Sequence, residues 1–165
     1  MKLLIQTVTM VSVIAALLLT GCKQSMVISQ VDYSQSIESV LQPDEDGTVE
    51  DKKHGLKFNI KPIQFAETQD SSSVTTEQVR YIRGQEGYYY ITAPDYKHVY
   101  VMAPEKNKLV LRETLKVSDE GIGEPAFNQR LSYIQLLNRS TGDVWKVNAD
   151  EIQKQESQMA KREEN

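Results

Sequence analysis

The chain has 165 residues, of which 39% are hydrophobic and 25% are charged, with a formal net charge of -4 and one cysteine. This mildly acidic balance gives no support to nucleic-acid binding, and a single cysteine excludes an intramolecular disulfide and a cysteine-rich metal site. The residues after the apolar first 21 are too polar for an integral membrane protein and long enough for one small domain.

Residues 1–21 have the three-part layout of a secretory signal peptide. Lys2 precedes an apolar stretch that is densest from Val8 to Leu19, and the small residues Thr20 and Gly21 close it. The alternative is a transmembrane anchor that is never cleaved. The apolar stretch is at the lower limit for spanning a hydrocarbon layer about 30 Å thick, and no cluster of lysine or arginine follows it.

The only cysteine, Cys22, comes directly after Leu19-Thr20-Gly21. This stretch resembles the lipobox of bacterial lipoprotein precursors, in which Leu, a small residue, and Gly or Ala precede Cys. The resemblance covers residues 1–22 alone. It implies that a lipoprotein signal peptidase cuts before Cys22, whose thiol carries a diacylglyceryl group and whose new amino group is acylated. Two or three acyl chains anchor a protein firmly, whereas one chain is marginal. No other cofactor and no metal are expected.

The residues after the cysteine bear on the membrane that receives the anchor. In lipoproteins of enteric-type bacteria, Asp after the cysteine favours retention in the inner membrane. Here Lys23 and Gln24 follow, so the resemblance implies the outer membrane, with the domain facing the periplasm.

Residues 22–55 are predicted to form a flexible, acidic tether. Polar residues alternate with isolated apolar ones, and residues 44–51 contain five carboxylates in eight positions. Such charge blocks are usually solvated. A calcium-binding EF-hand loop is the alternative, but alignment on Gly47 places Lys53 where a bidentate glutamate belongs.

Residues 56–148 are predicted to form a small antiparallel β domain. Leu56, Phe58 and Ile60 alternate with polar residues, as in a half-buried strand, and Pro62 indicates an edge strand or a bend before the alternation resumes. A polar loop is expected over 67–78 and another loop over 118–130. Further strands rich in Val, Ile and Tyr are expected over 79–83, 87–92, 98–102, 108–117 (broken near Glu113), 131–137 and 144–147.

These short strands, with turn signals between them, predict an all-β sandwich or barrel. Residues 138–143 have the composition of a hairpin turn, with Gly142 available for positive φ. Residues 149–165 are predicted to form a short C-terminal helix, because Asn148 and Glu151 have the spacing of a capping box.

Tyrosine placement is the most unusual feature of the domain. Six of the eight tyrosines lie between Tyr81 and Tyr100. An exposed row containing Tyr88, Tyr90 and Tyr100, with Arg83 beside it, would suit sugar stacking or a protein interface. We favour the other interpretation, in which these rings pack the core and stabilise cross-strand pairs.

The residues give little indication of catalysis. His54 and His98 are the only histidines, and their separation suggests no metal site. The leading hypothesis is a non-enzymatic envelope lipoprotein that binds another protein as an accessory or assembly subunit. A module that binds glycan or peptidoglycan through the tyrosines is the alternative, and a lipid-anchored hydrolase is the third.

Overall fold

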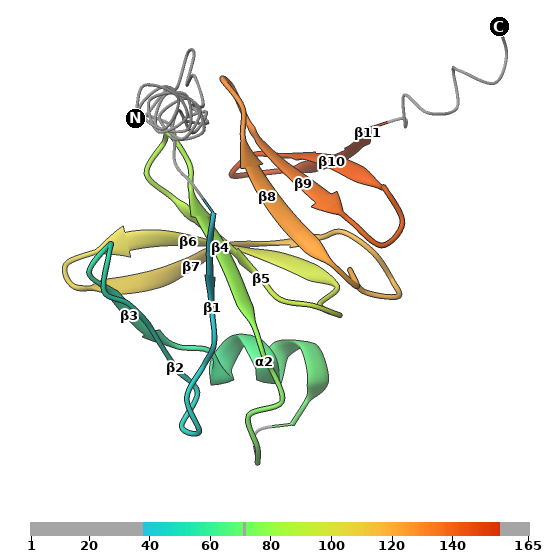
Figure 1. The fold of residues 1–165 in the computed structure, drawn as a ribbon. Helices are drawn as coiled ribbons and strands as arrows, with labels where there is room; N and C mark the ends of the chain where they lie inside the picture. Colours follow the sequence, from blue (N-terminus) through green and yellow to red (C-terminus); the bar gives the residue numbers. More distant parts are fainter. Residues whose placement is uncertain (1–37, 71, 156–165) are drawn as a thin grey trace, which may run out of the picture. The chain divides into compact units, whose positions relative to one another are not determined.

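The computed structural model describes residues 38–70 and 72–155. Within these residues the chain forms eleven strands and one helix, and every strand pairing is antiparallel (Figure 1). The predicted all-β, mainly antiparallel class is confirmed.

The larger sheet has five strands in the order β1-β4-β5-β6-β7. Its strands follow one another along the chain from β4 onward, so hairpins connect them, and β1 adds to the free side of β4. A β-bulge lies between β6 and β7, where Val101 pairs with Glu113 but Met102 pairs with Leu111. The bounds are Ser39–Leu41 for β1, Val79–Arg83 for β4, Tyr89–Thr92 for β5, His98–Glu105 for β6 and Lys108–Lys116 for β7.

The second sheet has four strands in the order β11-β10-β9-β8. The predicted turn over 138–143 joins two of them, and Gly142 takes positive φ within it. β8 lies inside the segment that the sequence assigned to a loop. The bounds are Pro125–Gln129 for β8, Ile134–Asn138 for β9, Val144–Val147 for β10 and Ile152–Gln155 for β11.

A two-stranded hairpin and the helix complete the described chain. β2 (Thr48–Asp51) pairs with β3 (Leu56–Asn59), and α2 (Lys61–Thr68) follows at once. The expectation that strand alternation resumes after Pro62 is wrong. Proline lies in the first turn of α2, where its missing N–H has no intrahelical partner to lose and its fixed φ suits the helix.

The two large sheets share one apolar core, here called the inter-sheet core. The five-stranded sheet contributes Ile82, Tyr90, Val99, Val101 and Leu115. The four-stranded sheet contributes Phe127, Ile134, Leu136, Trp145 and Val147. Alternate residues of each strand point toward the other sheet, as in a β-sandwich.

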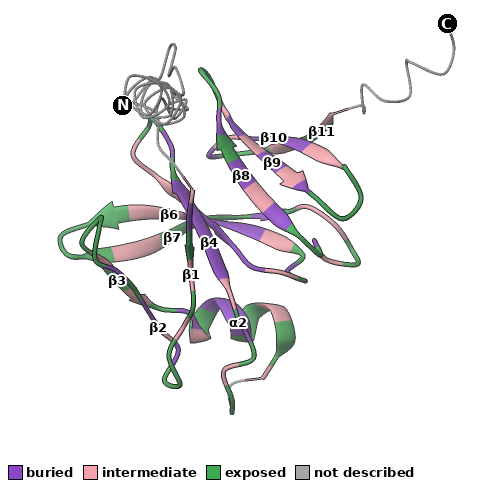
Figure 2. Ribbon diagram, in the orientation of Figure 1, coloured by how far each residue is buried: buried purple, intermediate pink, exposed green. Residues whose placement is uncertain are grey.

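The opposite face of the five-stranded sheet is also covered. The β2–β3 hairpin and α2 supply Val49, Ile60 and Ile63 to a second core, where they meet Val79, Tyr81, Ile91, Ala93, Tyr96 and Tyr100. Burial on both faces explains why β4 and β5 are almost wholly buried, whereas the tip of the β6–β7 hairpin is not (Figure 2).

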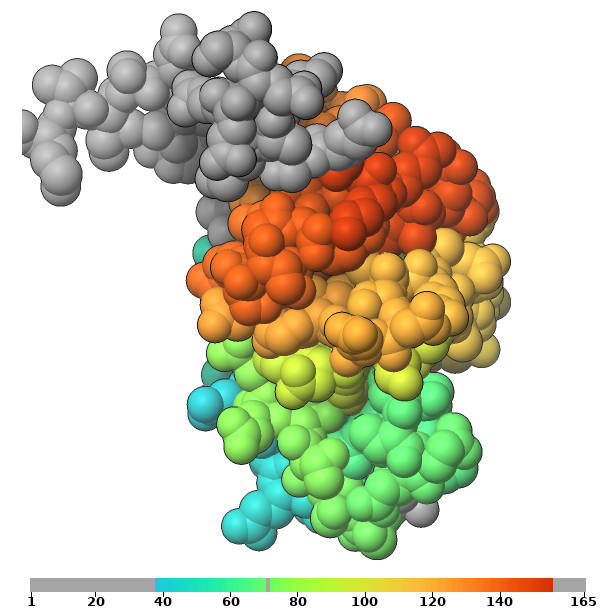
Figure 3. Space-filling model, turned by 90° about the vertical axis from the view of Figure 1, so that its right-hand side faces the viewer, coloured from blue at the N-terminus to red at the C-terminus, as the bar shows by residue number. Residues whose placement is uncertain are grey.

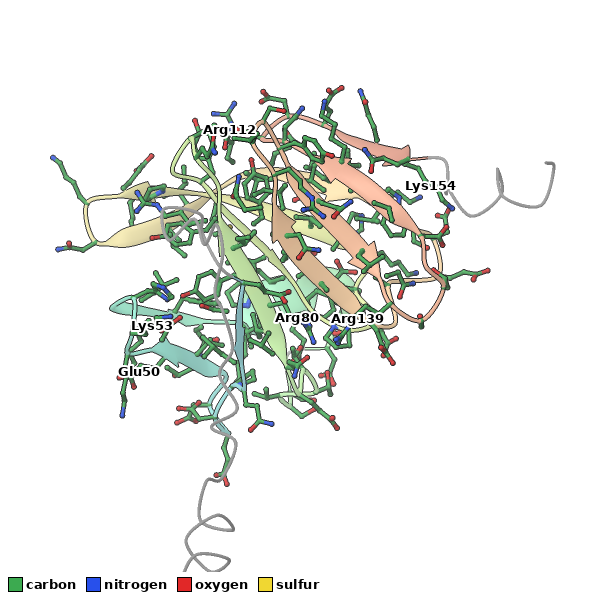
Figure 4. The ribbon with its side chains drawn as sticks, turned by 45° about the horizontal axis from the view of Figure 1, so that its top comes forward. Glu50, Lys53, Arg80, Arg112, Arg139 and Lys154 are labelled. Carbon is green, nitrogen blue, oxygen red and sulfur yellow. The ribbon has the colours of Figure 1, made fainter. Side chains whose placement is uncertain are left out.

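An ion pair between Arg80 of β4 and Glu38, the residue before β1, forms a link to β8. Glu38 Oε2 accepts a hydrogen bond from Arg80 Nη1 at 3.0 Å, and Glu38 Oε1 accepts one from Phe127 N at 2.9 Å. Arg80 lies among the strands rather than at the outer surface (Figure 4). Because β8 is an edge strand, the second bond satisfies a backbone N–H that has no partner strand.

A second link joins the two sheets at the bulge. Arg112, the residue that the bulge leaves unpaired, donates to Asp150 Oδ1 at 2.7 Å and to Tyr88 Oη at 2.6 Å. Its guanidinium lies 4.6 Å from the centroid of the Tyr88 ring. The bulge thus directs a long cationic side chain from β7 to the loop between β10 and β11.

The tether prediction for residues 22–55 is wrong for residues 38–55. These residues contain β1 and β2, and Val49 and Asp51 alternate inward between exposed neighbours. Asp44 accepts hydrogen bonds from Asp46 N and Thr48 N, which closes the turn before β2. The acidic block therefore contains a half-buried strand. Residues 22–37 lie outside the described residues.

The predicted C-terminal helix is wrong where the structure describes it. Asn148 Oδ1 does accept a hydrogen bond from Glu151 N, at 2.9 Å, but the result is a turn between β10 and β11. The same kind of side-chain hydrogen bond occurs in helix caps and in turns. Here the pairing of Ile152 with Val147 makes the segment after the turn a strand, β11. Residues 156–165 lie outside the described part of the chain.

The single described helix is too short to cross a membrane, and no other part of the described residues supplies a spanning helix. On the face shown in Figure 3, strands β9 to β11 (orange to red) form the upper surface, and α2 with the loop after it (green) forms the lower one.

Candidate functional site

The lipobox residues Leu19, Thr20, Gly21 and Cys22 lie outside the described residues. Their assignment, and the lipid on Cys22, stay predictions from the sequence.

The tyrosines do not form one exposed row. Tyr90 is 0% exposed in the inter-sheet core, and Tyr100 is 3% exposed in the second core on the opposite face of the sheet. Tyr88 is half-buried against the inter-sheet core, and Arg83 lies 5.7 Å from the centroid of the Tyr89 ring. The surface predicted from Tyr88, Tyr90, Tyr100 and Arg83 is therefore wrong, and the packing interpretation holds for the buried rings.

Two carboxylates among the described residues, Asp51 and Glu67, each hold one histidine. Asp51 Oδ2 accepts hydrogen bonds from Tyr81 Oη at 2.6 Å, Ser39 Oγ at 2.7 Å and His54 Nδ1 at 2.8 Å. Asp51 Oδ1 accepts from the backbone N–H groups of Lys53 and His54. This carboxylate, 6% exposed at the end of β2, ties the turn over 52–55 to β1 and β4.

These hydrogen bonds determine the charge of Asp51. Burial by itself raises the pKa of a carboxyl, but the bonds from His54, Tyr81 and Ser39 outweigh it and hold the pKa of Asp51 far below its ordinary 3.8. Ionised Asp51 therefore stabilises the folded state at all pH values above about 4.

We expect acid to remove this stabilisation. Because the folded-state pKa is depressed, the contribution of Asp51 is complete above the unfolded value of 3.8 and falls as the pH drops below it toward the folded value. Urea unfolding of the wild type and of Asp51→Asn should differ most at pH 6 and progressively less below pH 4. A difference that stayed constant from pH 6 down to pH 2 would contradict the assignment.

Ser39, His54 and Asp51 are the residue types of a hydrolase triad, but their arrangement differs. In a triad the serine contacts one imidazole nitrogen and the carboxylate contacts the other. Here Nδ1 of His54 faces both Asp51, at 2.8 Å, and Ser39, at 3.5 Å, and Ser39 Oγ donates to the carboxylate. These three side chains link β1 to the end of β2 and the turn after it. No base is placed to activate the Ser39 hydroxyl.

The second carboxylate, Glu67 of α2, anchors the start of β6. It accepts hydrogen bonds from Lys97 N, His98 N, His98 Nδ1 at 3.0 Å and Tyr100 Oη at 2.9 Å. Beside it lies a cavity of about 540 Å³, with Glu77, Asp95 and Lys97 on its walls. In the described residues, no three His, Cys, Asp or Glu side chains converge as metal ligands.

A second cavity, of about 440 Å³, lies between the β2–β3 hairpin and the tip of the β6–β7 hairpin. We call it the hairpin groove. Its apolar lining consists of Leu56, Tyr89, Pro104 and Leu109, and its charged lining consists of Lys57, Glu105, Lys106 and Lys108. The same end of the β2–β3 hairpin carries Lys53 (Figure 4). A lining that combines apolar and charged groups can bind a ligand that carries both, so the groove is the candidate functional site.

The Asp51 network supports one wall of the hairpin groove. By accepting the Lys53 and His54 N–H groups, Asp51 orients the turn that leads into Gly55, Leu56 and Lys57. The opposite wall is the two-residue turn of the β6–β7 hairpin, where Asn107 takes positive φ.

The chain matches no protein-family model, no curated protein and no solved structure. Its function must therefore be inferred from its own residues.

Sequence reasoning missed both the hairpin groove and the role of Asp51. The groove joins residues about fifty positions apart along the chain, and each lysine is by itself an ordinary surface residue. The burial of Asp51 could have been predicted from one feature: it lies two residues after Val49 on a strand, and so on the same, inward face.

Proposed function

We propose that this chain is a lipid-anchored lipoprotein of a bacterial cell envelope whose β domain binds another protein, without catalysis, as an accessory or assembly subunit. The observation that carries the anchor is the single cysteine, Cys22, placed directly after Leu19-Thr20-Gly21. Lys23 and Gln24 favour the outer membrane, with the domain in the periplasm.

The hairpin groove supports the binding role. Its walls come from two hairpins held by the second core and by the Asp51 network, so the groove is formed before any partner arrives. A preformed site avoids the entropy cost of ordering loops on binding.

The two alternatives have less support. The glycan-binding hypothesis relied on an exposed tyrosine row, and Tyr90 and Tyr100 are buried in separate cores. The hydrolase hypothesis would need an activated nucleophile, and Ser39 donates to Asp51 instead.

We expect Cys22→Ser to abolish lipidation. Without the thiol there is no acceptor for the diacylglyceryl group, so the variant should take up no fatty-acid probe in cells and should accumulate as a larger, uncleaved precursor. Gly21→Ala is the matched control, because alanine also satisfies the lipobox pattern and should leave labelling and size unchanged. Normal labelling and processing of Cys22→Ser would overturn the lipoprotein assignment.

Binding to a protein is tested separately, by crosslinking in intact cells and purification from a mild detergent extract. We expect one defined envelope protein to co-purify with the wild type in a fixed ratio. Retention on peptidoglycan with no protein partner would favour the glycan alternative and contradict the proposal.

A further inference from the structure

We propose that the hairpin groove and the adjoining edge of β7 bind an extended, acidic segment of the partner protein. This inference rests on the proposed function and specifies the partner's chemistry and its site.

The charge of the groove opposes that of the chain. Three lysines and one glutamate line it, although the whole chain has a net charge of -4. Lys108 pairs with Glu105 at 3.6 Å, whereas Lys57, which lies opposite Glu50 of β2, and Lys106 form no ion pair with any described residue. Two ammonium groups without an ion-pair partner among the described residues, in a cleft with both apolar and charged lining, favour a ligand that carries carboxylates.

An apolar row leads from the groove to the edge of the sheet. Tyr89 lines the groove and pairs with Met102, which pairs with Leu111 of β7. Residues directly opposite one another on paired strands share a face, so the three side chains form a continuous row. Leu111, at its end, is 52% exposed.

The edge itself offers backbone hydrogen bonds. β7 is the last strand of the five-stranded sheet and pairs with β6 alone among the described strands. Residues 108–111 of β7 precede the bulge and are in regular register with β6. An extended peptide can add to such an edge as a new strand, with main-chain bonds for affinity and alternate side chains for specificity.

The backbone edge decides between a peptide and a membrane surface. Anionic lipid headgroups could meet the lysines, but they cannot continue a β ladder or place alternate side chains over Leu111. An acidic segment with apolar residues at alternate positions satisfies the lysines, the apolar row and the edge together.

The test uses the full-length protein in mild detergent and measures fluorescence anisotropy of labelled ten-residue peptides. The first probe alternates glutamate and valine, the second replaces glutamate with lysine, and the third replaces valine with serine. The protein variants are Lys57→Glu/Lys106→Glu and Leu111→Ser. Lys97→Glu/Lys146→Glu is the matched control, because it makes the same change in charge at two lysines that lie outside both the groove and β7.

We expect saturable binding of the glutamate–valine peptide that weakens at high salt, and no binding of the lysine peptide. Affinity should fall at least about tenfold in the double groove variant and about fivefold in Leu111→Ser or with the serine peptide, and should stay within about twofold in the control. Equal affinity in the groove and control variants would overturn the proposal. So would a failure of the glutamate–valine peptide to bind at all.

Failure of this experiment is distinguishable from failure of the proposed function. Lipidation of Cys22 and co-purification of an envelope protein are measured on the wild type, without the groove variants or the peptides. If both hold and no acidic peptide binds, the partner uses another surface of the domain.

Discussion

Replacing Asp51 with alanine should destabilise the domain by about 3–5 kcal/mol, because it removes the acceptor of five hydrogen bonds inside the protein. The Tyr81 hydroxyl is then left without its partner in the second core, where burial prevents full compensation by water. The turn over 52–55 also loses both of the backbone bonds that orient it. We expect the Asn variant to lose less, because its amide oxygen can still accept from that turn.

Urea unfolding followed by the fluorescence of Trp145, the only tryptophan and a member of the inter-sheet core, measures this loss. Glu50→Ala is the matched control, since Glu50 precedes Asp51 on the same strand and points outward. It should change the free energy of unfolding by no more than about 0.5 kcal/mol. Equal stabilities of the two variants would show that the Asp51 network contributes nothing.

Replacing Gly121 with alanine should cost about 3 kcal/mol or more. Gly121 has φ of +92°, and a Cβ atom there would lie 2.4 Å from the Asp95 carbonyl oxygen. The loop cannot move away freely, because Asp95 N donates to Ile122 O and Ile122 N donates to Tyr96 O. Ile122 is fully buried in the inter-sheet core, so displacement of the loop would also open that core.

Gly142→Ala separates the two causes of this loss. Gly142 has φ of +77°, but nothing lies within 4 Å of its added Cβ atom. This control should cost only about 1 kcal/mol of backbone strain. If Gly121→Ala proved no worse in urea unfolding, close packing of residues 118–124 against the β5–β6 turn would be contradicted.

The central strands were predictable because their signals are local. The strands expected over 79–83, 87–92, 98–102, 108–117 and 144–147 correspond to β4, β5, β6, β7 and β10, and the expected break near Glu113 is the bulge at Arg112. β-Branched and aromatic residues separated by turn residues carry this information within about ten positions.

Segments whose sequence pattern fits two kinds of local structure were predicted wrongly. Asn148 and Glu151 form the bond of a capping box, but the segment turns into β11. Pro62 interrupts a strand and equally begins a helix, and the sequence does not distinguish the two. Residues 38–55 have the composition of a solvated linker. They form strands because β1 pairs with β4 and because β2 helps to cover one face of the five-stranded sheet.

The candidate site was less predictable than the fold. The tyrosine cluster drew attention as a surface, yet its residues divide between two cores because both faces of the five-stranded sheet are covered. No local sequence pattern indicates that the face opposite the inter-sheet core is covered, because the β2–β3 hairpin and α2 form that cover. The lysines of the hairpin groove could not be recognised as one site from the sequence, because they come from two hairpins that only the fold brings together.

The sequence by itself determined the all-β antiparallel class and the positions of the central strands, because alternation and turn chemistry act between near neighbours. It also supplies the whole basis for the proposed anchor at Cys22. Only the tertiary structure decided that Asp51 is an ionised buried centre, that Tyr90 and Tyr100 face different cores, and that three separate lysines line one cleft. The physical reason is that burial and charge environment depend on which distant segments pack together, and that information is spread over the whole chain.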